Sequence, residues 1–246
     1  MGGRGMKTVF IGDIHGRDTW KQIVESEKPD HVIFMGDYFD SFDIGAAEQI
    51  HNFKEIVEYR ESNQSHVVML IGNHDLHYFT GDNGTSGFQR SMYFPIHELV
   101  EANKHHLQMA YQYKEYLCSH AGISPEWLEE RGWDGQESIV RFVNQVWKHK
   151  PGAFKFRGFD AYGDDTFQTP VWIRPRSLQR ACADHWIRKE YIQIVGHTQV
   201  DKIDIKGKST GGRYYFIDAL PAGQYLVHDD ENGLTLGTIK YERTTV

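Results

Sequence analysis

The sequence predicts an α/β protein in which a largely parallel sheet comes first and antiparallel strands come last. In the first third of the chain, apolar runs of strand length alternate with segments of helical spacing, and this order is typical of β-α-β units with a parallel sheet. In the last third, strand-like runs follow one another across short turns, which favours an antiparallel second sheet or sheet edge. A chain of 246 residues is long enough to bury a large core.

The first third is predicted as β-α-β-α-β. Apolar strands cover residues 7–13, 30–37 and 66–73. Helices are expected between them, over residues 18–28 and 45–62. In the second of these helices the apolar residues recur three and four positions apart, as on one helix face. The pattern therefore indicates a largely parallel sheet with helices on its faces.

The middle of the chain mixes both kinds of element. Residues 95–104 have helical spacing, and residues 105–122 alternate with period two, which predicts a pair of antiparallel strands. Residues 124–132 begin with Ser and Pro, a common start of a helix. Residues 136–150 are predicted to form an amphipathic helix, and residues 154–169, rich in Gly and Asp, a long loop.

The last third returns to strands. Five segments have the apolar or alternating pattern of strands, with short turns between them. They cover residues 191–197, 200–206, 213–220, 223–229 and 234–241.

Composition excludes several classes of protein. The net charge is −7 with histidines counted as neutral, so a general binder of nucleic acid or of anionic membranes is not expected. No run approaches the roughly 18 apolar residues of a membrane span, and the start lacks the apolar segment of a signal peptide. The two cysteines do not make a disulfide framework, which favours a reducing compartment and a cytoplasmic location. The oligomeric state is left open.

No repeat, low-complexity tract or linker divides the chain. We therefore expect a single domain over residues 6–246. Residues 1–5, before Met6, are expected to be a disordered leader or an engineered remnant.

Polar residues of similar chemistry follow five of the apolar strands. Three strands end in "GDIHG", "GDYFD" and "GNHD", and two later ones end in "CSHAG" and "VGHT". Ligands of open α/β sheets bind beyond the carboxyl ends of the strands, so these scattered groups should converge in space. The groups are Asp13, His15, Asp37, Asp40, Asn73, His74, His120 and His197.

The residue types in these motifs point to metal ions. Carboxylate oxygens, imidazole nitrogens and amide oxygens are ligands for Mn, Fe, Zn or Mg. Two metals fit the count of ligands, and two metals roughly 3.5–4 Å apart clamp a phosphoryl group and supply a hydroxide for in-line attack. The first metal would take Asp13, His15 and Asp37, and the second would take Asp37, Asn73, His120 and His197, with Asp37 as the bridge.

In this order, "GDIHG", "GDYFD", "GNHD", "SHAGISP" and "GHT" resemble the motifs of the calcineurin-like metallophosphoesterases. The chain looks most like their phosphoprotein-phosphatase branch, which includes the Ser/Thr protein phosphatases and the symmetrical diadenosine tetraphosphate hydrolases. The resemblance implies a four-layer α/β/β/α sandwich with mixed sheets and with the metals at the strand ends. It implies the same six metal ligands, with two divalent ions, manganese as the first choice and iron, zinc or magnesium as alternatives.

The resemblance also implies catalytic roles. It makes His74 the group that donates a proton to the leaving oxygen, and it pairs His74 with Asp40, whose charge would hold the imidazolium. A nearby carboxylate raises the pKa of a histidine, so that the ring can be protonated near neutral pH.

The phosphate-binding residues depart from the family pattern. The family usually places a phosphate-gripping arginine after the second motif, whereas this chain has Ser41 there. Arg174, in "VWIRPRSL", resembles a second phosphate-binding arginine of the family, and Arg176 is the next choice. Arg90, in "SGFQR", could replace the missing arginine.

Three functions remain open at this point. The first is a metal-dependent phosphatase that hydrolyses a phosphate monoester by attack of a metal-bridging hydroxide, with phospho-Ser/Thr in protein as one candidate substrate. The second is a hydrolase of diadenosine tetraphosphate or another nucleotide, because "GNHDLH" and "SHAGISPEW" look more like the dinucleotide hydrolases while "SGFQR" resembles the protein phosphatases. The third is an inactive metal-binding scaffold, against which the complete ligand set argues.

Several residues near the motifs receive structural interpretations. Asp75 is expected to cap the backbone after the third motif, Cys118 to lie in the core, and Asp218 to support the site from behind. The aromatic stretch 78–94 is either a substrate platform or ordinary packing. His77 has no assigned role.

Overall fold

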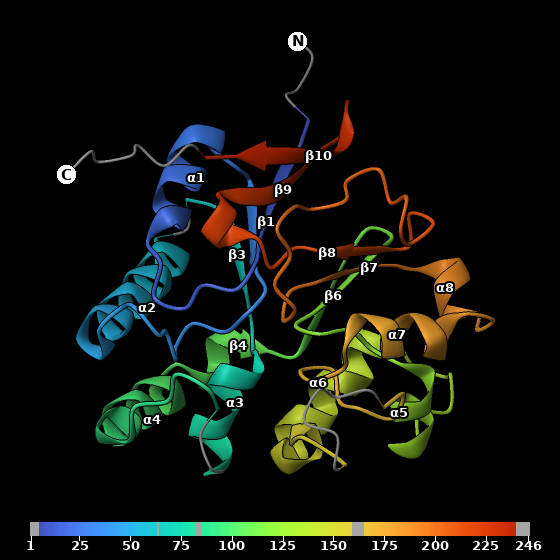
Figure 1. Cartoon of the computed structure of the whole chain (residues 1–246), viewed down its shortest axis with the longest axis horizontal. Helices are drawn as coiled ribbons and strands as arrows, with labels where there is room; N and C mark the ends of the chain where they lie inside the picture. Colours follow the sequence, from blue (N-terminus) through green and yellow to red (C-terminus); the bar gives the residue numbers. More distant parts are fainter. Residues whose placement is uncertain (1–4, 63, 82–84, 159–164, 240–246) are drawn as a thin grey trace.

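Two β-sheets lie face to face, with helices outside them, in a computed structural model of the whole chain (Figure 1). The structure describes residues 5–62, 64–81, 85–158 and 165–239. The two sheets hold the strands whose ends carry the polar motifs.

The first sheet has six strands in the order β10-β9-β1-β2-β3-β4. The pairs β1–β2, β2–β3 and β3–β4 are parallel, whereas β9 runs antiparallel to both β1 and β10. The bounds are β1 (Lys7–Ile11), β2 (His31–Phe34), β3 (His66–Leu70), β4 (Leu107–Gln108), β9 (Gln224–Asp229) and β10 (Gly233–Thr238).

The second sheet has four strands in the order β5-β6-β7-β8. β5 and β6 are antiparallel, and β6, β7 and β8 run parallel to one another. The bounds are β5 (Ala110–Tyr113), β6 (Tyr116–Ser119), β7 (Ile192–Val195) and β8 (Tyr214–Phe216).

The helices lie on both flanks of the paired sheets. The first two lie on one flank, and the last four lie on the other (Figure 1). They are α1 (Thr19–Glu27), α2 (Ala46–Glu61), α3 (Asn73–Thr80), α4 (Tyr93–Ala102), α5 (Pro125–Glu130), α6 (Ile139–His149), α7 (Pro175–Cys182) and α8 (Ile187–Glu190).

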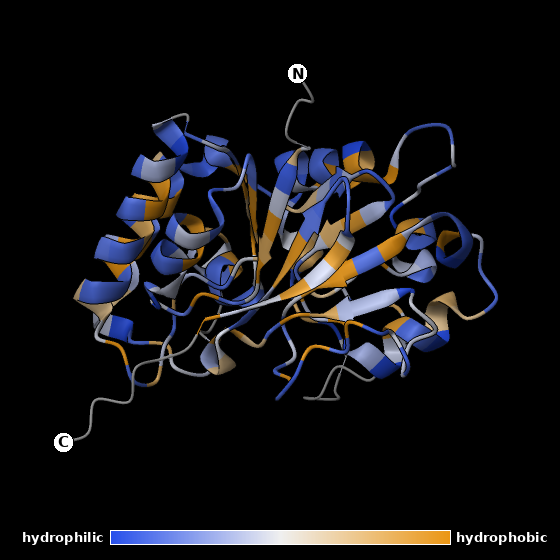
Figure 2. Cartoon of the chain, turned by 90° about the horizontal axis from the view of Figure 1, so that it is seen from above, coloured by the Kyte–Doolittle hydropathy of each residue, from blue (hydrophilic) through white to orange (hydrophobic). Residues whose placement is uncertain are grey.

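Hydrophobic residues are concentrated in the central strands (Figure 2), and the side chains of these strands are buried on both faces of the sheets. In β1, Val9 and Ile11 belong to the apolar cluster that includes the helix residue Ile23, whereas Phe10 belongs to the cluster between the sheets. Phe10 meets the ring of Tyr113 in β5 edge-on, with centroids 5.9 Å apart. Burial on both faces explains why β1 is a continuous apolar run. These layers confirm the predicted four-layer α/β/β/α sandwich with mixed sheets.

The strand predictions for the last third are partly wrong. β9 and β10 form the predicted antiparallel edge, but β7 and β8 are parallel. Residues 200–206 form no strand. Ile203 is buried between the sheets, but its backbone N–H donates to the side chain of Gln224 at 2.9 Å, so the segment is held by burial and side-chain contacts without a ladder. The segment between β7 and β8 is therefore a crossover connection, which returns the chain to the end of the sheet where β7 begins, so that β8 runs parallel to β7.

The third predicted strand is shorter than expected. β3 ends at Leu70, and α3 begins at Asn73 inside the "GNHD" motif. Gly81, in the left-handed conformation at φ 67°, ends α3. The motif is therefore the first turn of a helix, and side chains three and four positions apart in it share a face.

Some predictions fall outside the described residues. Residues 1–4 of the predicted leader and residues 159–164 of the predicted loop belong to this group. The single domain over residues 6–246 stays a prediction. Within the described ranges, no helix combines the length and apolar character needed to cross a membrane.

Candidate metal centre

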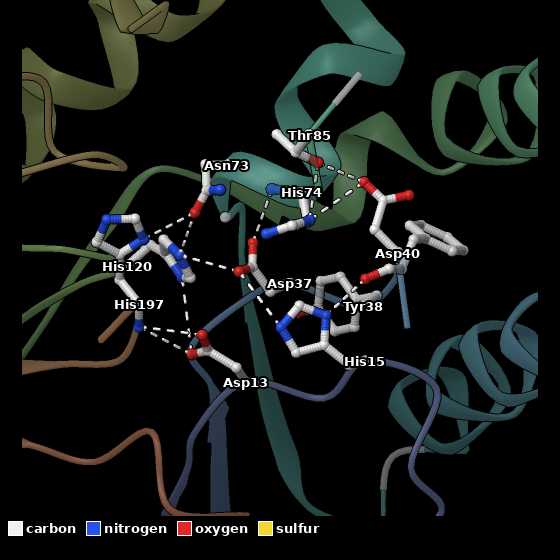
Figure 3. A network of polar contacts seen from close by, with 12 residues as sticks. Asp13, His15, Asp37, Tyr38, Asp40, Asn73, His74, Thr85, His120 and His197 are labelled. Carbon is white, nitrogen blue, oxygen red and sulfur yellow. Dashed lines mark hydrogen bonds and ion pairs between the residues drawn. The ribbon is translucent and has the colours of Figure 1, made fainter. Parts of the chain in front are cut away.

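The polar residues singled out in the sequence meet at the strand ends (Figure 3). Asp13 follows β1, Asp37 follows β2 and Asn73 follows β3, all in the first sheet. His120 follows β6 and His197 follows β7, both in the second sheet. Both sheets therefore contribute side chains to one cluster.

The backbone is strained at the residues of this cluster. Six described residues other than glycine have a positive φ, and four of them are His15 (42°), Asp37 (53°), Asp40 (62°) and His197 (66°). Each such conformation costs on the order of 1–3 kcal/mol and persists only where the surrounding structure enforces it. The fold therefore favours the shape of this cluster over local backbone preference.

Two glycines make room for the carboxylates. A Cβ on Gly72 would overlap Oδ1 of Asp37, and a Cβ on Gly196 would overlap Oδ1 of Asp13. Without a Cβ, the backbone can approach each carboxylate closely. The glycines of the motifs thus serve packing around the acidic groups.

The carboxylate of Asp37 lies at the middle of the cluster and is 2% exposed. Its Oδ1 accepts a hydrogen bond from the backbone N–H of His74 at 2.8 Å. Its Oδ2 lies 3.3 Å from Nε2 of His120 and 3.7 Å from Nε2 of His15. Burial raises the pKa of Asp37, but the imidazoles of His120 and His74 more than offset it and hold the pKa well below its usual range. Asp37 is therefore an anion shared by several imidazoles.

Other buried carboxyl groups surround Asp37. Burial, with repulsion from Asp218 and Asp37, raises the pKa of Asp13 well above its ordinary value. Burial and the charge on Asp37 raise the pKa of Asp218 to about 6 and that of Asp75 to about 7. Desolvated like charges disfavour one another, so a cation among them would relieve an excess of negative charge.

Three histidines of this cluster each donate one ring N–H to a backbone carbonyl. Because a carbonyl only accepts, the second nitrogen of each neutral ring carries a lone pair, and metal-bound histidines are usually fixed in this way. The second nitrogens belong to the cluster shown in Figure 3. The donors are Nδ1 of His15 to Phe39 at 2.7 Å, Nδ1 of His120 to Met35 at 2.8 Å and Nε2 of His197 to Trp172 at 3.1 Å.

Lone pairs meet around the side-chain oxygen of Asn73. Its Oδ1 lies 3.0 Å from Nε2 of His120 and 2.8 Å from Nδ1 of His197. In the neutral rings that donate to the backbone, both nitrogens would face this oxygen with lone pairs, as ligands of one ion do. Burial lowers the pKa of His120, but the charge of Asp37 and the hydrogen bond to it raise this pKa overall, so a proton on Nε2 is favoured when no ion is bound. Ligands about 2.1 Å from one metal lie about 3 Å from each other, so this donor set fits a metal ion held between them.

Among the described residues, two groups of side chains could each hold an ion, and both contain Asp37. One group is His15, Asp37 and His74, and the other is Asp13, Asp37 and His120, with the ligand atoms of each group within 4.8 Å of one another. One group joins Asp13 to His120 and the other joins His15 to His74, with Asp37 common to both. The division of the six predicted ligands between two metals, with Asp37 as the bridge, stays a prediction.

His74 lies beside this centre and is fixed from two sides. Its Nδ1 is 3.2 Å from Oδ2 of Asp40 and 2.8 Å from Oγ1 of Thr85, while its backbone N–H donates to Asp37. Burial lowers the pKa of His74, but the charge of Asp37 and the hydrogen bond to Asp40 raise it above its ordinary value overall. The predicted pair of His74 and Asp40 is therefore in direct contact.

Asp40 accepts hydrogen bonds from three further side chains that the sequence did not single out. Nε2 of His77 donates at 2.7 Å, the hydroxyl of Tyr78 at 2.7 Å and the hydroxyl of Thr85 at 2.6 Å. Burial raises the pKa of Asp40, but the hydrogen bonds from His74, His77 and Thr85 lower it to about 2. If "NHDLHY" is read as a helix, His77 and Tyr78 lie three and four positions after His74 and share its face. This pattern would have identified two of the three further donors.

Asp75 caps the backbone, as predicted, and it also ties two motifs together. Its Oδ2 accepts the N–H groups of Gly72 and Asp37, each at 2.8 Å, and its Oδ1 accepts that of Tyr38 at 2.8 Å. The chain after β2 is thereby fixed to the start of α3.

Ser41 is used within its own turn. Its Oγ donates to the carboxylate of Asp43 at 2.9 Å and accepts the N–H of Ile44 at 3.2 Å. The position where the family pattern has an arginine therefore serves local backbone structure.

Among the three predicted phosphate-binding arginines, Arg174 lies against the centre. Its Nη1 donates to the carbonyl of His197 at 3.3 Å and to the hydroxyl of Thr198 at 3.1 Å. Burial lowers its pKa, and the carboxylates of the centre act in the opposite direction. Arg176 and Arg90 are exposed, and the structure does not bring them to the cluster through any contact among the described residues.

Cys118 and the aromatic stretch 78–94 contribute to packing. Cys118 is fully buried between the sheets, and burial raises its pKa, so it is a core residue. In the aromatic stretch, Tyr78 packs on Tyr93 and Phe88 with centroid distances of 5.8 and 6.0 Å. Ordinary packing therefore accounts for these rings, and residues 82–84 of the stretch lie outside the described part of the chain.

Residues 6–219 match a family model described as calcineurin-like phosphoesterase. The chain belongs to the calcineurin-like phosphoesterases. Members of this family use divalent metals to hydrolyse phosphoesters, which agrees with the fold and with the acidic and histidine cluster at the strand ends. The phosphoesterase is therefore a metal-dependent hydrolase.

Two solved structures of low sequence identity resemble this phosphoesterase, and the first of them shares its fold. A mutant cold-active protein tyrosine phosphatase superposes with a TM-score of 0.68 at 18% identity, over 96% of this chain and 80% of that chain. A metallophosphoesterase from Sphaerobacter thermophilus has a TM-score of 0.47 at 14% identity, over 96% of this chain and 90% of that chain. No curated protein sequence matched the chain.

Replacing Asp37 tests whether one carboxylate serves both metal positions. Asp37→Asn removes the charge but keeps the shape, so we expect the affinity for both ions to fall by at least the roughly 10–100-fold that loss of a supporting group alone costs. Metal content after reconstitution, measured by elemental mass spectrometry, checks this. Asp43→Asn, at an exposed carboxylate, is the matched control. Two ions per chain in Asp37→Asn at the wild-type metal concentration would contradict the shared ligand.

Proposed function

We propose that the protein is a phosphatase that hydrolyses phosphate monoesters with two divalent metal ions. The observation that carries the proposal is the setting of His74, whose Nδ1 contacts Asp40 and Thr85 while its backbone N–H is bonded to Asp37. A proton donor is thereby placed beside the group of carboxylates and imidazoles that could hold the metals.

Six residues would hold the metals: Asp13, His15, Asp37, Asn73, His120 and His197. When bound, the metals supply Lewis-acid polarisation of the phosphoryl oxygens and activation of the attacking water. Manganese is our first choice of metal, with iron, zinc or magnesium as alternatives. We place the protein in the cytoplasm because its two cysteines make no disulfide framework, as in a reducing compartment.

His74 would donate the proton to the leaving oxygen. With Nδ1–H directed at Asp40 and Thr85, the nitrogen left to face a substrate is Nε2. Asp40 stays ionised, because hydrogen bonds hold its pKa at about 2, and its charge favours the imidazolium form of His74. A general acid held in this way typically contributes 10²–10⁴-fold to the rate.

Arg174 would hold the phosphoryl oxygens. Its guanidinium is anchored by the carbonyl of His197 and the hydroxyl of Thr198, and its five N–H donors suit a phosphate. Arg176 and Arg90 are weaker candidates, since both are exposed. Ser41 offers no replacement for the family's arginine because its hydroxyl is engaged in a turn.

The substrate class follows less directly from the site. A phosphorylated protein is the first candidate substrate. Phospho-Ser/Thr fits the resemblance to the Ser/Thr protein phosphatases, and phosphotyrosine fits the structural neighbour named a protein tyrosine phosphatase. The second candidate is a nucleotide such as diadenosine tetraphosphate, which "GNHDLH" favours. The inactive scaffold is disfavoured by the intact contact between His74 and Asp40.

A substrate panel tests the proposal. The protein is reconstituted separately with Mn²⁺, Fe²⁺, Zn²⁺ and Mg²⁺ and assayed with p-nitrophenyl phosphate, a phosphopeptide, diadenosine tetraphosphate and a cyclic nucleotide. We expect turnover of the two monoesters to exceed that of the other two substrates. Preferred cleavage of diadenosine tetraphosphate would select the nucleotide hydrolase, and hydrolysis of none would select the scaffold.

Replacing His74 tests the assignment of the proton donor. His74→Asn should lower kcat roughly 10²–10⁴-fold while the metals stay bound. The loss should be larger for phenyl phosphate than for p-nitrophenyl phosphate, because the poorer leaving group needs the proton more. His51→Asn, at an exposed histidine of α2, is the control, and equal losses for both esters would contradict the assignment.

A further inference from the structure

A groove of about 680 Å³ lies on the flank of the second sheet, separate from the candidate centre. It is bounded by the end of α5, the start of α6 and the end of α8, which lie together on that flank (Figure 1). Among the described residues that line it, none is a predicted metal ligand or a neighbour of His74. A groove of this volume holds a ligand larger than one side chain.

Three aromatic side chains form one wall of the groove. The rings of Trp133 and Trp186 stack with their centroids 5.2 Å apart and 27° between their planes, and the ring of Tyr191 meets that of Trp186 at 67° and 6.4 Å. Trp133 is fixed, because its indole N–H donates to the carbonyl of Glu137 at 3.0 Å. All three rings are only partly buried. The faces of such rings attract cations, and those of tryptophan do so most strongly.

Four carboxylates also line the groove, and they belong to Glu129, Asp134, Glu137 and Glu190. None of the described residues of the lining is a Lys, an Arg or a His. Burial and the charge of Glu190 raise the pKa of Tyr191 above its ordinary value, so this carboxylate acts on the aromatic wall. A ligand in the groove would therefore meet negative charge beside the faces of aromatic rings.

Surface cations of the chain itself neutralise this charge only in part. Nε2 of His185 lies 3.9 Å from Oε1 of Glu129, and Nε of Arg141 lies 3.5 Å from Oε2 of Glu137. In the part of the chain that the structure describes, no cation pairs with the other two carboxylates. A cation from outside would therefore complete the charge balance of the groove.

We propose that this groove binds an arginine-containing segment of a partner protein, with a guanidinium group against the indole rings. Arginine fits both features of the groove, because its planar guanidinium stacks on aromatic faces and also binds carboxylates through two parallel hydrogen bonds. The groove is larger than one guanidinium group, so residues beside the arginine can lie in it as well, which favours a polypeptide. The net charge of −7 favours the approach of a basic partner.

Titration with three peptides tests the proposal. The first is the acetylated and amidated pentapeptide Gly-Arg-Ala-Arg-Gly, and the others carry lysine or citrulline, a neutral analogue of arginine, in place of both arginines. Each is added to the full chain reconstituted with Zn²⁺, and NMR of the indole N–H groups reports binding. Of the six tryptophans, only Trp133 and Trp186 should shift. The Kd should be about 5-fold higher for the lysine peptide and at least about 10-fold higher for the citrulline peptide.

Substitutions in the groove locate the binding. Glu190→Gln should raise the Kd of the arginine peptide about 3-fold, the scale of an exposed ion pair. Glu231→Gln makes the same change of charge at an exposed position between β9 and β10 and should leave the Kd unchanged. Trp186→Leu should bring the Kd values of the arginine and lysine peptides together, because the aromatic face that distinguishes them is lost.

Three results would overturn the groove as an arginine site: equal Kd values for the arginine and citrulline peptides, shifts confined to other tryptophans, or equal losses in the two glutamine variants. Binding of N-acetylarginine amide as tight as that of the pentapeptide would assign the groove to a small guanidinium compound and overturn the polypeptide partner. The inference goes beyond the proposed phosphatase function and does not depend on it, because peptide binding is measured without phosphate hydrolysis.

Discussion

The buried carboxylate of Asp37 is the group on which the rest of the site depends. The backbone of Asp37 has a positive φ, and only a glycine fits at position 72 beside its carboxylate. The carboxylate accepts a hydrogen bond from the backbone N–H of His74. It also faces the imidazoles of His15 and His120. The positive φ costs stability through strain, and the burial of the charge costs stability through desolvation. Together they are consistent with a shared anion between two cations, which would offset both costs.

The fold enforces this arrangement through ordinary secondary structure. Parallel pairing brings the ends of β1, β2 and β3 to one edge, and parallel pairing of β6 with β7 does the same in the second sheet. The carboxylate of Asp75 then fixes the chain after β2 to the first turn of α3. The ligands therefore come from segments that cannot move independently of the core.

The sequence predicted the centre better than its surroundings, for physical reasons. The pattern of apolar residues and the residue types identify Asp13, His120 and His197 as site residues, because each follows an apolar strand. The same features do not identify the side chains that donate hydrogen bonds to Asp40. Thr85 lies in a loop, and His77 is recognisable only once "GNHDLHY" is read as a helix. β8 is parallel to β7 because residues 200–206 form a crossover, in which Ile203 is buried. The alternating pattern of these residues does not distinguish a crossover of this kind from a strand.

The central claim is that two metal ions share Asp37, and an anomalous diffraction map of the protein crystallised with Mn²⁺ tests it most directly. We expect two peaks roughly 3.5–4 Å apart, both within ligand distance of the Asp37 carboxylate. One peak should lie toward His15 and the other toward Asn73, His120 and His197. A single peak, or two peaks that do not share Asp37, would contradict this claim.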